Sequence, residues 1–389
     1  MRVTHVITRL IVGGAQENTL STVAGLRQIP GVEVYMISGP TTGPEGSLEP
    51  EARRALGEQY VVDLPELVRP VHPLKDWLAL RKLERLLREQ RPDIVHTHSA
   101  KGGILGRLAA KRAGVPVIIH TIHGPSFGPF QGPAANFLFR AAEKFAAGVT
   151  GHFIVVADAM KEQHLAAGIG RPEQYTKILS GFKLAPFLTA NNDEQLRAKL
   201  DIAPDDFVVG KIARLFKLKG HDDLFAVAPE LIRRNSKIKF LLIGDGPWRG
   251  RFEDLARGHG LEKHFIFAGL VPPADVAKYT GIMDALVHLS LREGLPRALP
   301  QALAAGKPVV AYDCDGAREV CLNNETGFLI QPRDTAALKD RLLQLANDPA
   351  LRERLGRRGR EFVRDNFAVE KMVEDIYNLY VKLAASQVH

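Results

Sequence analysis

Short apolar runs alternate with longer amphipathic stretches along most of the chain. In the first half, the pattern predicts strands at residues 2–7, 32–38, 94–97, 115–121, 151–156 and 177–179. It predicts helices between them at residues 15–26, 74–88, 101–113 and 136–150. Strands that alternate with helices in this way are typical of a parallel sheet with helices on both faces.

The same alternation begins again after a loop-rich stretch near residues 180–195. Further strands are expected at residues 207–213, 239–243, 265–268, 285–289 and 308–312, and a helix at 221–234. A length of 389 residues also favours two domains. The pattern therefore predicts an α/β protein with two Rossmann-like, doubly wound domains facing across a cleft. The expected domains are residues 1–185 and 186–369, with a last helix at about 370–385 packing back on the first.

The composition, 45% hydrophobic and 25% charged, is that of an ordinary globular protein. Only two cysteines occur, Cys314 and Cys321, which excludes a disulfide framework and favours a reducing compartment. The longest apolar runs are too short to cross a bilayer, and the first residues lack the features of a signal peptide. We therefore expect a cytoplasmic protein.

The net charge is +8, and most of the excess lies in the first half. Basic residues are spread through helical patterns and aromatic residues make up only 7%, so nucleic acid is the weakest candidate partner. The helix expected at 74–88 combines Trp77 and several leucines with many Lys and Arg side chains. It is either a basic face for an anionic membrane surface or a solvated helix packed on its own sheet.

Parallel sheets bind ligands at the carboxyl ends of their strands, so the strand-to-helix loops are where chemistry is expected. Four loops stand out, at residues 10–14, 120–133, 214–220 and 292–299. In the first, Gly13 and Gly14 allow a ligand phosphate to approach the start of a helix, or simply form a tight turn. The loop lacks the GxGxxG fingerprint, which disfavours a dehydrogenase.

Histidines gather around the second loop. His96 and His98 are two residues apart and so lie on one face of a strand. We expect His96 to be a core residue and His98 to reach a ligand. His123 precedes Gly124 in the loop and can contact a sugar hydroxyl or a phosphate. No Asp or Glu alternates with these histidines, so no metal site is predicted.

The third and fourth loops carry charged side chains after buried strands. Arg214 and Lys219 flank a loop that ends at Gly220, and a guanidinium with an ammonium suits a diphosphate. Lys217 between them is expected to face solvent. Glu293 follows the strand at 285–289, ahead of a helix expected to begin near Pro296. Its carboxylate can accept hydrogen bonds from hydroxyl groups.

Together these motifs resemble the retaining nucleotide-sugar glycosyltransferases of glycosyltransferase family four, which have the GT-B fold. The matching segments are residues 13–15, 123–124, 214 with 219–220, 242–247, 267–269, 293–296, 304–311 and 325–327. The resemblance spans nearly the whole chain and is strongest from residue 207 to 330. No single motif is specific, but their joint order and spacing are.

The resemblance implies a role for each matching residue. The implied catalytic residues are Glu293, Arg214, Lys219 and His123. The implied substrate-binding residues are Gly13, Gly14, His98, Gly269, Leu270, Gly294, Leu295, Pro296 and Gln301. Gln301 departs from the family, which has a glutamate at the ribose-binding position; the amide keeps an acceptor oxygen and loses the charge.

The implied reaction transfers a sugar from a nucleoside diphosphate to an acceptor hydroxyl with retention at the anomeric carbon, in cell-envelope glycan, glycolipid or polysaccharide synthesis. The acceptor is a carbohydrate, a lipid-linked molecule or a small molecule, and the enzyme is expected in the cytoplasm or at the inner face of the membrane. Asp313 and Asp315 imitate a metal-binding motif outside its usual context, so no obligatory cofactor is expected. A nucleotide-sugar epimerase or phosphorylase, and a non-catalytic nucleotide-sugar-binding homologue, are the alternatives.

Overall fold

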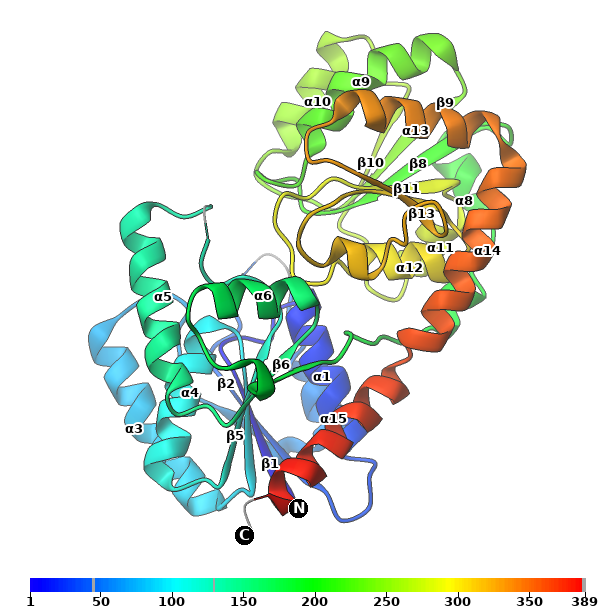
Figure 1. The fold of residues 1–389 in the computed structure, drawn as a ribbon. Helices are drawn as coiled ribbons and strands as arrows, with labels where there is room; N and C mark the ends of the chain where they lie inside the picture. Colours follow the sequence, from blue (N-terminus) through cyan, green and yellow to red (C-terminus); the bar gives the residue numbers. More distant parts are fainter. Residues whose placement is uncertain (44–45, 129, 387–389) are drawn as a thin grey trace. The chain divides into compact units, whose positions relative to one another are not determined.

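The structure is a computed structural model that describes residues 1–43, 46–128 and 130–386 (Figure 1). The chain divides into two compact units. Unit 1 holds Met1–Phe182 and the chain from Val369 onward, and unit 2 holds Lys183–Ala368. The boundary expected after residue 185 falls inside α7 (Ala185–Leu188), which belongs wholly to unit 2. Both units have the predicted Rossmann-like α/β architecture.

Unit 1 is built on a seven-stranded sheet in the order β3-β2-β1-β4-β5-β6-β7, in which neighbouring strands are parallel. Its strands are β1 (Arg2–Ile7), β2 (Glu33–Ser38), β3 (Val61–Asp63), β4 (Ile94–His98), β5 (Val117–Ile122), β6 (His152–Val155) and β7 (Tyr175–Lys177). The strand order reverses beside β1, because β2 lies on one side of it and β4 on the other.

Helices cover both faces of this sheet, as Figure 1 shows. They are α1 (Gly14–Leu26), α2 (Glu49–Leu56), α3 (Pro73–Gln90), α4 (Ala100–Ala113), α5 (Pro133–Ala147), α6 (Asp158–Ala166) and α15 (Val369–Ala385). Alternate residues of each strand point to opposite faces. Thus Val3 of β1 packs in the core beneath α1 and α15, whereas Val6 packs in the core beneath α3 and α4.

The last helix, α15, completes unit 1 although it follows unit 2 in the chain. Its buried residues Met372, Ile376, Leu379 and Tyr380 recur at helical spacing and join the core beneath α1. Burial of such side chains contributes about 1.5–3 kcal/mol each. The apolar stripe therefore explains why the chain returns to unit 1.

Unit 2 repeats the plan with a six-stranded parallel sheet in the order β10-β9-β8-β11-β12-β13. Its strands are β8 (Phe207–Ile212), β9 (Ile238–Ile243), β10 (Phe265–Gly269), β11 (Ala285–His288), β12 (Val309–Tyr312) and β13 (Gly327–Ile330). Its helices are α7, α8 (Glu194–Lys199), α9 (His221–Arg234), α10 (Arg249–Gly258), α11 (Val276–Gly281), α12 (Ala298–Ala304), α13 (Thr335–Asn347) and α14 (Pro349–Asn366). Here the order reverses beside β8.

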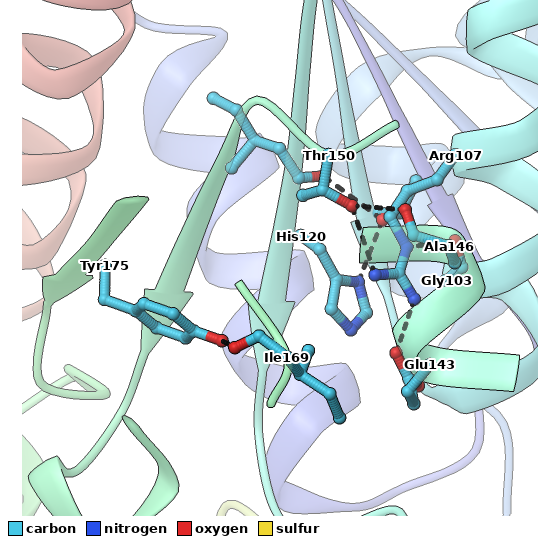
Figure 2. Close-up of polar contacts among 10 residues, drawn as sticks. Gly103, Arg107, His120, Glu143, Ala146, Thr150, Ile169 and Tyr175 are labelled. Atoms are coloured by element: carbon cyan, nitrogen blue, oxygen red, sulfur yellow. Dashed lines mark hydrogen bonds and ion pairs between the residues drawn. The ribbon is translucent and has the colours of Figure 1, made fainter. Parts of the chain in front are cut away.

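A buried ion pair fastens α5 to α4 in unit 1 (Figure 2). Nη2 of Arg107 lies 2.7 Å from Oε2 of Glu143, and the two side chains are 0% and 2% exposed. Nε of Arg107 donates to the Gly103 carbonyl at 2.9 Å, and Nη1 donates to Oγ1 of Thr150 at 3.3 Å. Charges can be buried when they are paired and hydrogen-bonded in this way, but removing one partner leaves the other uncompensated.

We predict that Glu143→Ala destabilises unit 1 by about 3–5 kcal/mol, because it leaves the Arg107 guanidinium buried without a counter-charge. The double variant Arg107→Leu/Glu143→Leu should recover most of that loss. Urea unfolding followed by circular dichroism measures both changes.

The exposed pair Arg85–Glu89 provides the control, because its side chains are 81% and 56% exposed. Glu89→Ala should leave the unfolding midpoint unchanged. Equal midpoints for Glu143→Ala and Glu89→Ala would contradict a structural role for the buried pair.

Candidate active site

Two loops meet at the carboxyl edge of the unit 2 sheet, where its strand order reverses. One follows β8 and ends at Gly220, and the other follows β11 and runs past Glu293. Gly220 has φ +65°, and a Cβ atom there would lie only 2.1 Å from the Leu289 carbonyl oxygen. Only glycine permits this close approach of the two backbones. The loops are therefore held together at the point where an open α/β sheet binds ligands.

Lys219 and Glu293 join these loops through their side chains. The Lys219 ammonium donates to the Glu293 carboxylate, and Nε2 of His288 lies 3.5 Å from the same carboxylate oxygen. Burial alone would raise the Glu293 pKa, but His288 and the Lys219 charge outweigh it and hold that pKa well below its usual range. Glu293 is therefore ionised at neutral pH and can accept hydrogen bonds from hydroxyl groups.

Asp315 holds the backbone of the Glu293 loop. Its Oδ2 accepts a hydrogen bond from the Glu293 N–H at 2.7 Å, and the Gly316 N–H donates to the Gly294 carbonyl at 3.0 Å. Asp313, the other carboxylate of the suspected metal motif, receives two hydrogen bonds of 3.0 Å from Arg318. Sequence reasoning missed the positioning role of Asp315, since its partner lies 22 residues away.

Lys211 is a second residue that sequence reasoning missed. It lies near the end of β8, its side chain is 2% exposed, and its ammonium has no hydrogen bond or ion pair among the described residues. Burial and the Lys219 charge lower its pKa to about 7. Lys211 and Lys219 thus both add positive charge to this edge, which suits an anionic ligand.

The other predicted residues of unit 2 lie along the same edge. Arg214 is exposed just after β8, and its guanidinium lies 5.7 Å from the centre of the Phe216 ring. Lys217 is exposed, as expected. At the end of β10, Gly269 has φ +70° and Leu270 is 64% exposed.

The Glu293 loop is longer than the sequence analysis expected. Helix α12 begins at Ala298, not near Pro296, because residues 294–296 form a buried turn and Arg297 occupies the N-cap position. Gly294, Leu295 and Pro296 are buried in this turn, and Gln301 is half-buried on α12.

At the carboxyl edge of unit 1, Gly13 is the N-cap residue of α1 and Gly14 its exposed first residue. No side chain caps this helix start. Oγ1 of Thr8, after β1, lies 2.7 Å from Oγ of Ser99 and accepts a hydrogen bond from the Gly102 N–H at 2.8 Å. These bonds join the ends of β1 and β4, between which the strand order of the sheet reverses.

A chain of hydrogen bonds runs through the core beneath this edge. Nε2 of His123 lies 3.0 Å from Nδ1 of His98, and Nε2 of His98 lies 2.9 Å from Nδ1 of His5. The Tyr380 hydroxyl follows, 3.4 Å from Nε2 of His5 and 2.5 Å from Nδ1 of His96. Nε2 of His96 lies 2.6 Å from Oγ1 of Thr121.

This chain changes the interpretation of the histidines. His98 is only 1% exposed with both ring nitrogens engaged, so its visible role is to hold His123 rather than to meet a ligand. His96 is a buried core histidine, as expected. Sequence reasoning missed His5, although it stands on β1 in register with His96.

His5, His96 and His98 also lie close enough together to hold a metal ion, with one ligand atom of each within 4.8 Å of the others. However, every ring nitrogen of these three residues already has a hydrogen-bond partner within the chain. Burial lowers the pKa of His5 to about 3 and that of His123 to about 4. The histidines are therefore neutral at pH 7 and hydrogen-bonded to one another.

Two family models match the chain. The one described as "Glycosyl transferase 4-like domain" covers residues 13–178, and the one described as "Glycosyl transferases group 1" covers residues 192–362. The chain is 30% identical to the UDP-Gal:alpha-D-GlcNAc-diphosphoundecaprenol alpha-1,3-galactosyltransferase of Escherichia coli, over 83% of this chain and 84% of that protein. The chain belongs to glycosyltransferase family four. It is thus an enzyme, and its relatives favour transfer over the epimerase alternative.

This glycosyltransferase is also similar to a second relative in sequence and to a solved structure in fold. It is 26% identical to the alpha-monoglucosyldiacylglycerol synthase of Acholeplasma laidlawii, over 78% of each chain. Its structure is similar to that of Anabaena HepE, solved in complex with UDP, with a TM-score of 0.83 and 21% identity over 98% of this chain and 100% of that one. The GT-B fold predicted from the sequence is thereby confirmed.

We predict that acid destabilises the glycosyltransferase through its buried histidines. Their folded-state pKa values lie below the unfolded value of about 6.5, so the unfolded state binds more protons below that pH. The contribution of these histidines to the free energy of unfolding should be fully present above pH 6.5. As the pH falls, each such histidine should cost about 1.4 kcal/mol per unit until its own folded pKa is reached.

Urea midpoints measured from pH 8 to pH 5 test this expectation. His123→Gln should flatten the profile, whereas His259→Gln, at an exposed position, should not. A midpoint that stays constant over this pH range would contradict the assignment of neutral buried histidines.

Proposed function

We propose that the enzyme transfers a hexose from a nucleoside diphosphate to an acceptor hydroxyl with retention, and that unit 2 binds the donor while unit 1 binds the acceptor. The observation that carries the proposal is the Lys219–Glu293 pair, which joins the two loops at the switch point of the unit 2 sheet. Cationic and carboxylate side chains together at this edge suit a ligand with both phosphates and hydroxyls.

In the proposed reaction, the bond between the anomeric carbon and the phosphate oxygen breaks, and a bond to the acceptor oxygen forms on the same face. The acceptor proton passes to the departing phosphate. Arg214 and Lys219 offset the negative charge on that phosphate, and Lys211 adds positive potential from below. Ionised Glu293 accepts hydrogen bonds from sugar hydroxyls. Neutral His123 from unit 1 contacts the sugar as a hydrogen-bonding group.

We propose that these side chains, rather than a metal ion, neutralise the diphosphate. Asp313 is occupied by Arg318, and Asp315 is occupied by the Glu293 backbone. A uridine nucleotide is the favoured donor, because the Escherichia coli relative uses UDP-Gal and HepE was solved with UDP. Gly269 and Leu270 are then assigned to the nucleobase, Gln301 to the ribose, and Gly13 and Gly14 to the phosphate side of the sugar.

Arg214→Ala and Lys219→Ala are each expected to lower kcat by about 10²–10³, because each removes a charge that stabilises a developing anion. Initial rates with radiolabelled UDP-hexoses and extracted lipid acceptors measure this loss. Lys217→Ala provides the matched control on the same loop and should retain wild-type rates. Turnover near wild type in both variants would refute the donor-site assignment.

A lipid-linked acceptor is supported by the names of both relatives, and an exposed apolar surface of unit 1 supports it independently. Over the described part of the chain, no helix is long and apolar enough to span a bilayer. On α5, however, Phe137, Leu138 and Phe145 are 71%, 65% and 70% exposed, while Glu143 faces the interior. The helix therefore presents its apolar side outward.

Helix α3 carries a similar group. Leu74 and Trp77 are 62% and 56% exposed at its start, and the Arg81 guanidinium lies 6.0 Å from the Trp77 ring centre. The rest of α3 packs on the sheet through Leu83 and Leu87, so the proposed docking face is confined to the start of this helix. Both α3 and α5 contact α4. Apolar side chains among basic ones suit peripheral docking on an anionic membrane, which we place at its cytoplasmic face.

We predict that vesicles with anionic lipid retain the enzyme at low salt and release it at high salt, since salt screens the basic residues. Phe137→Ser/Phe145→Ser should abolish retention, because it removes the apolar contact. Val381→Ser, at another exposed apolar position of unit 1, is the control. Equal recovery from neutral and anionic vesicles would show that α3 and α5 face water instead.

A further inference from the structure

Tyr380 stands at the centre of the histidine chain, although it belongs to the last helix of the protein. Its side chain is 0% exposed, and its hydroxyl lies between His5 of β1 and His96 of β4. We propose that Tyr380 is a positioning residue that sets the tautomer of His123 through His5 and His98. The proposal rests on the proposed function only for the part that His123 has in transfer.

The chain can carry this influence because a neutral imidazole has one N–H donor and one acceptor nitrogen. Whichever nitrogen of a histidine accepts, the other must donate to the next residue. His5 and His98 each use both nitrogens within the chain, so neither can change its tautomer alone. The direction of the Tyr380 hydroxyl is therefore transmitted to His123.

The distances favour one direction. The Tyr380 oxygen lies 2.5 Å from Nδ1 of His96 and 3.4 Å from Nε2 of His5. O–H donors make shorter hydrogen bonds than N–H donors. We therefore assign the Tyr380 proton to the His96 contact, which leaves the Tyr380 oxygen to accept from Nε2–H of His5.

The remaining assignments follow along the chain. Nδ1 of His5 accepts from Nε2–H of His98, and Nδ1 of His98 accepts from Nε2–H of His123. His123 is then left with an unprotonated Nδ1, which has no hydrogen bond to another described residue. If Tyr380 instead donated to Nε2 of His5, every hydrogen bond in the series would reverse. His96 would then accept from Thr121, and Nδ1 of His123 would carry a proton and be a donor. Tyr380 thus makes His123 an acceptor for a sugar hydroxyl.

The rest of the environment agrees with a chain of neutral rings. His5, His96 and Tyr380 lie on the sheet face beneath α1 and α15, among apolar side chains. Burial lowers the pKa of each histidine in the chain. Tautomers of neutral rings are therefore the states that differ at neutral pH.

The test compares the wild type with Tyr380→Phe, which removes only the hydroxyl. Tyr175→Phe is the matched control, because Tyr175 is buried in the same unit and donates to the Ile169 carbonyl at 2.8 Å (Figure 2). This hydrogen bond is not part of the series that joins Tyr380 to His123. Nitrogen-15 NMR of histidine-labelled protein at pH 7.5 reports the tautomers, and His123→Gln assigns the His123 signals. The spectra require no turnover.

We expect His123 in the wild type and in Tyr175→Phe to carry its proton on Nε2. In Tyr380→Phe the tautomers should mix, since loss of one ordinary hydrogen bond changes such a ratio by about two- to tenfold. The same variant should lower kcat by about two- to tenfold with little change in KM for the UDP-hexose. If Tyr380→Phe does not fold, His5→Gln interrupts the chain at its next member and should give the same mixing.

Three results would overturn the proposal. These are a wild-type His123 protonated on Nδ1, a His123 tautomer that Tyr380→Phe and His5→Gln leave unchanged, and stoichiometric zinc in the purified protein bound at His5, His96 and His98. If the tautomer changes as expected but the wild type transfers no sugar from any nucleotide donor, the proposed function fails and the positioning role of Tyr380 stands.

Discussion

The candidate sites of this glycosyltransferase depend on two central strands, one in each sheet. β1 pairs in parallel with β2 and β4, and β8 pairs in parallel with β9 and β11. Parallel strands place all their carboxyl ends at one edge, and the reversal of strand order sends the two adjoining loops to opposite faces. The loops after β8 and β11 therefore flank one crevice position of the kind where open α/β sheets bind ligands, and so do the loops after β1 and β4. Lys219 with Glu293, and Thr8 with Ser99, join these loops at the two edges.

The polar groups that the sheets bury are matched by partners from distant parts of the chain. Arg107 has Glu143, the Glu293 backbone has Asp315, and His96 has Tyr380 from α15. Unsatisfied, such groups would cost the fold several kcal/mol each. Their pairing therefore ties functional geometry to stability. The hydrogen bond between Tyr380 and His96 also stabilises the packing of α15 on unit 1, in addition to its apolar contacts.

Periodicity predicted the layout of the fold well, because strands and helices with one buried face carry a local signal. The positions of Arg214, Lys219 and Glu293 in loops that follow buried strands were also predicted from sequence, since charged residues are conspicuous there. Boundaries were less certain: α12 starts later than expected, because the buried turn at residues 294–296 depends on contacts with the loop around Asp315 and Gly316. The exposure of the apolar side chains of α5 was not predicted, because periodicity does not say which face of a helix meets solvent.

By itself, the sequence determined the two α/β domains and the loops that carry the charged groups. It did so because backbone preference and apolar spacing act over a few residues. Only the tertiary structure decided how His5, His98 and His123 connect, that Asp315 holds Glu293, and that Lys211 is buried beside Lys219. Hydrogen bonds and desolvation depend on which residues become neighbours in space, and the strand order of each sheet establishes that.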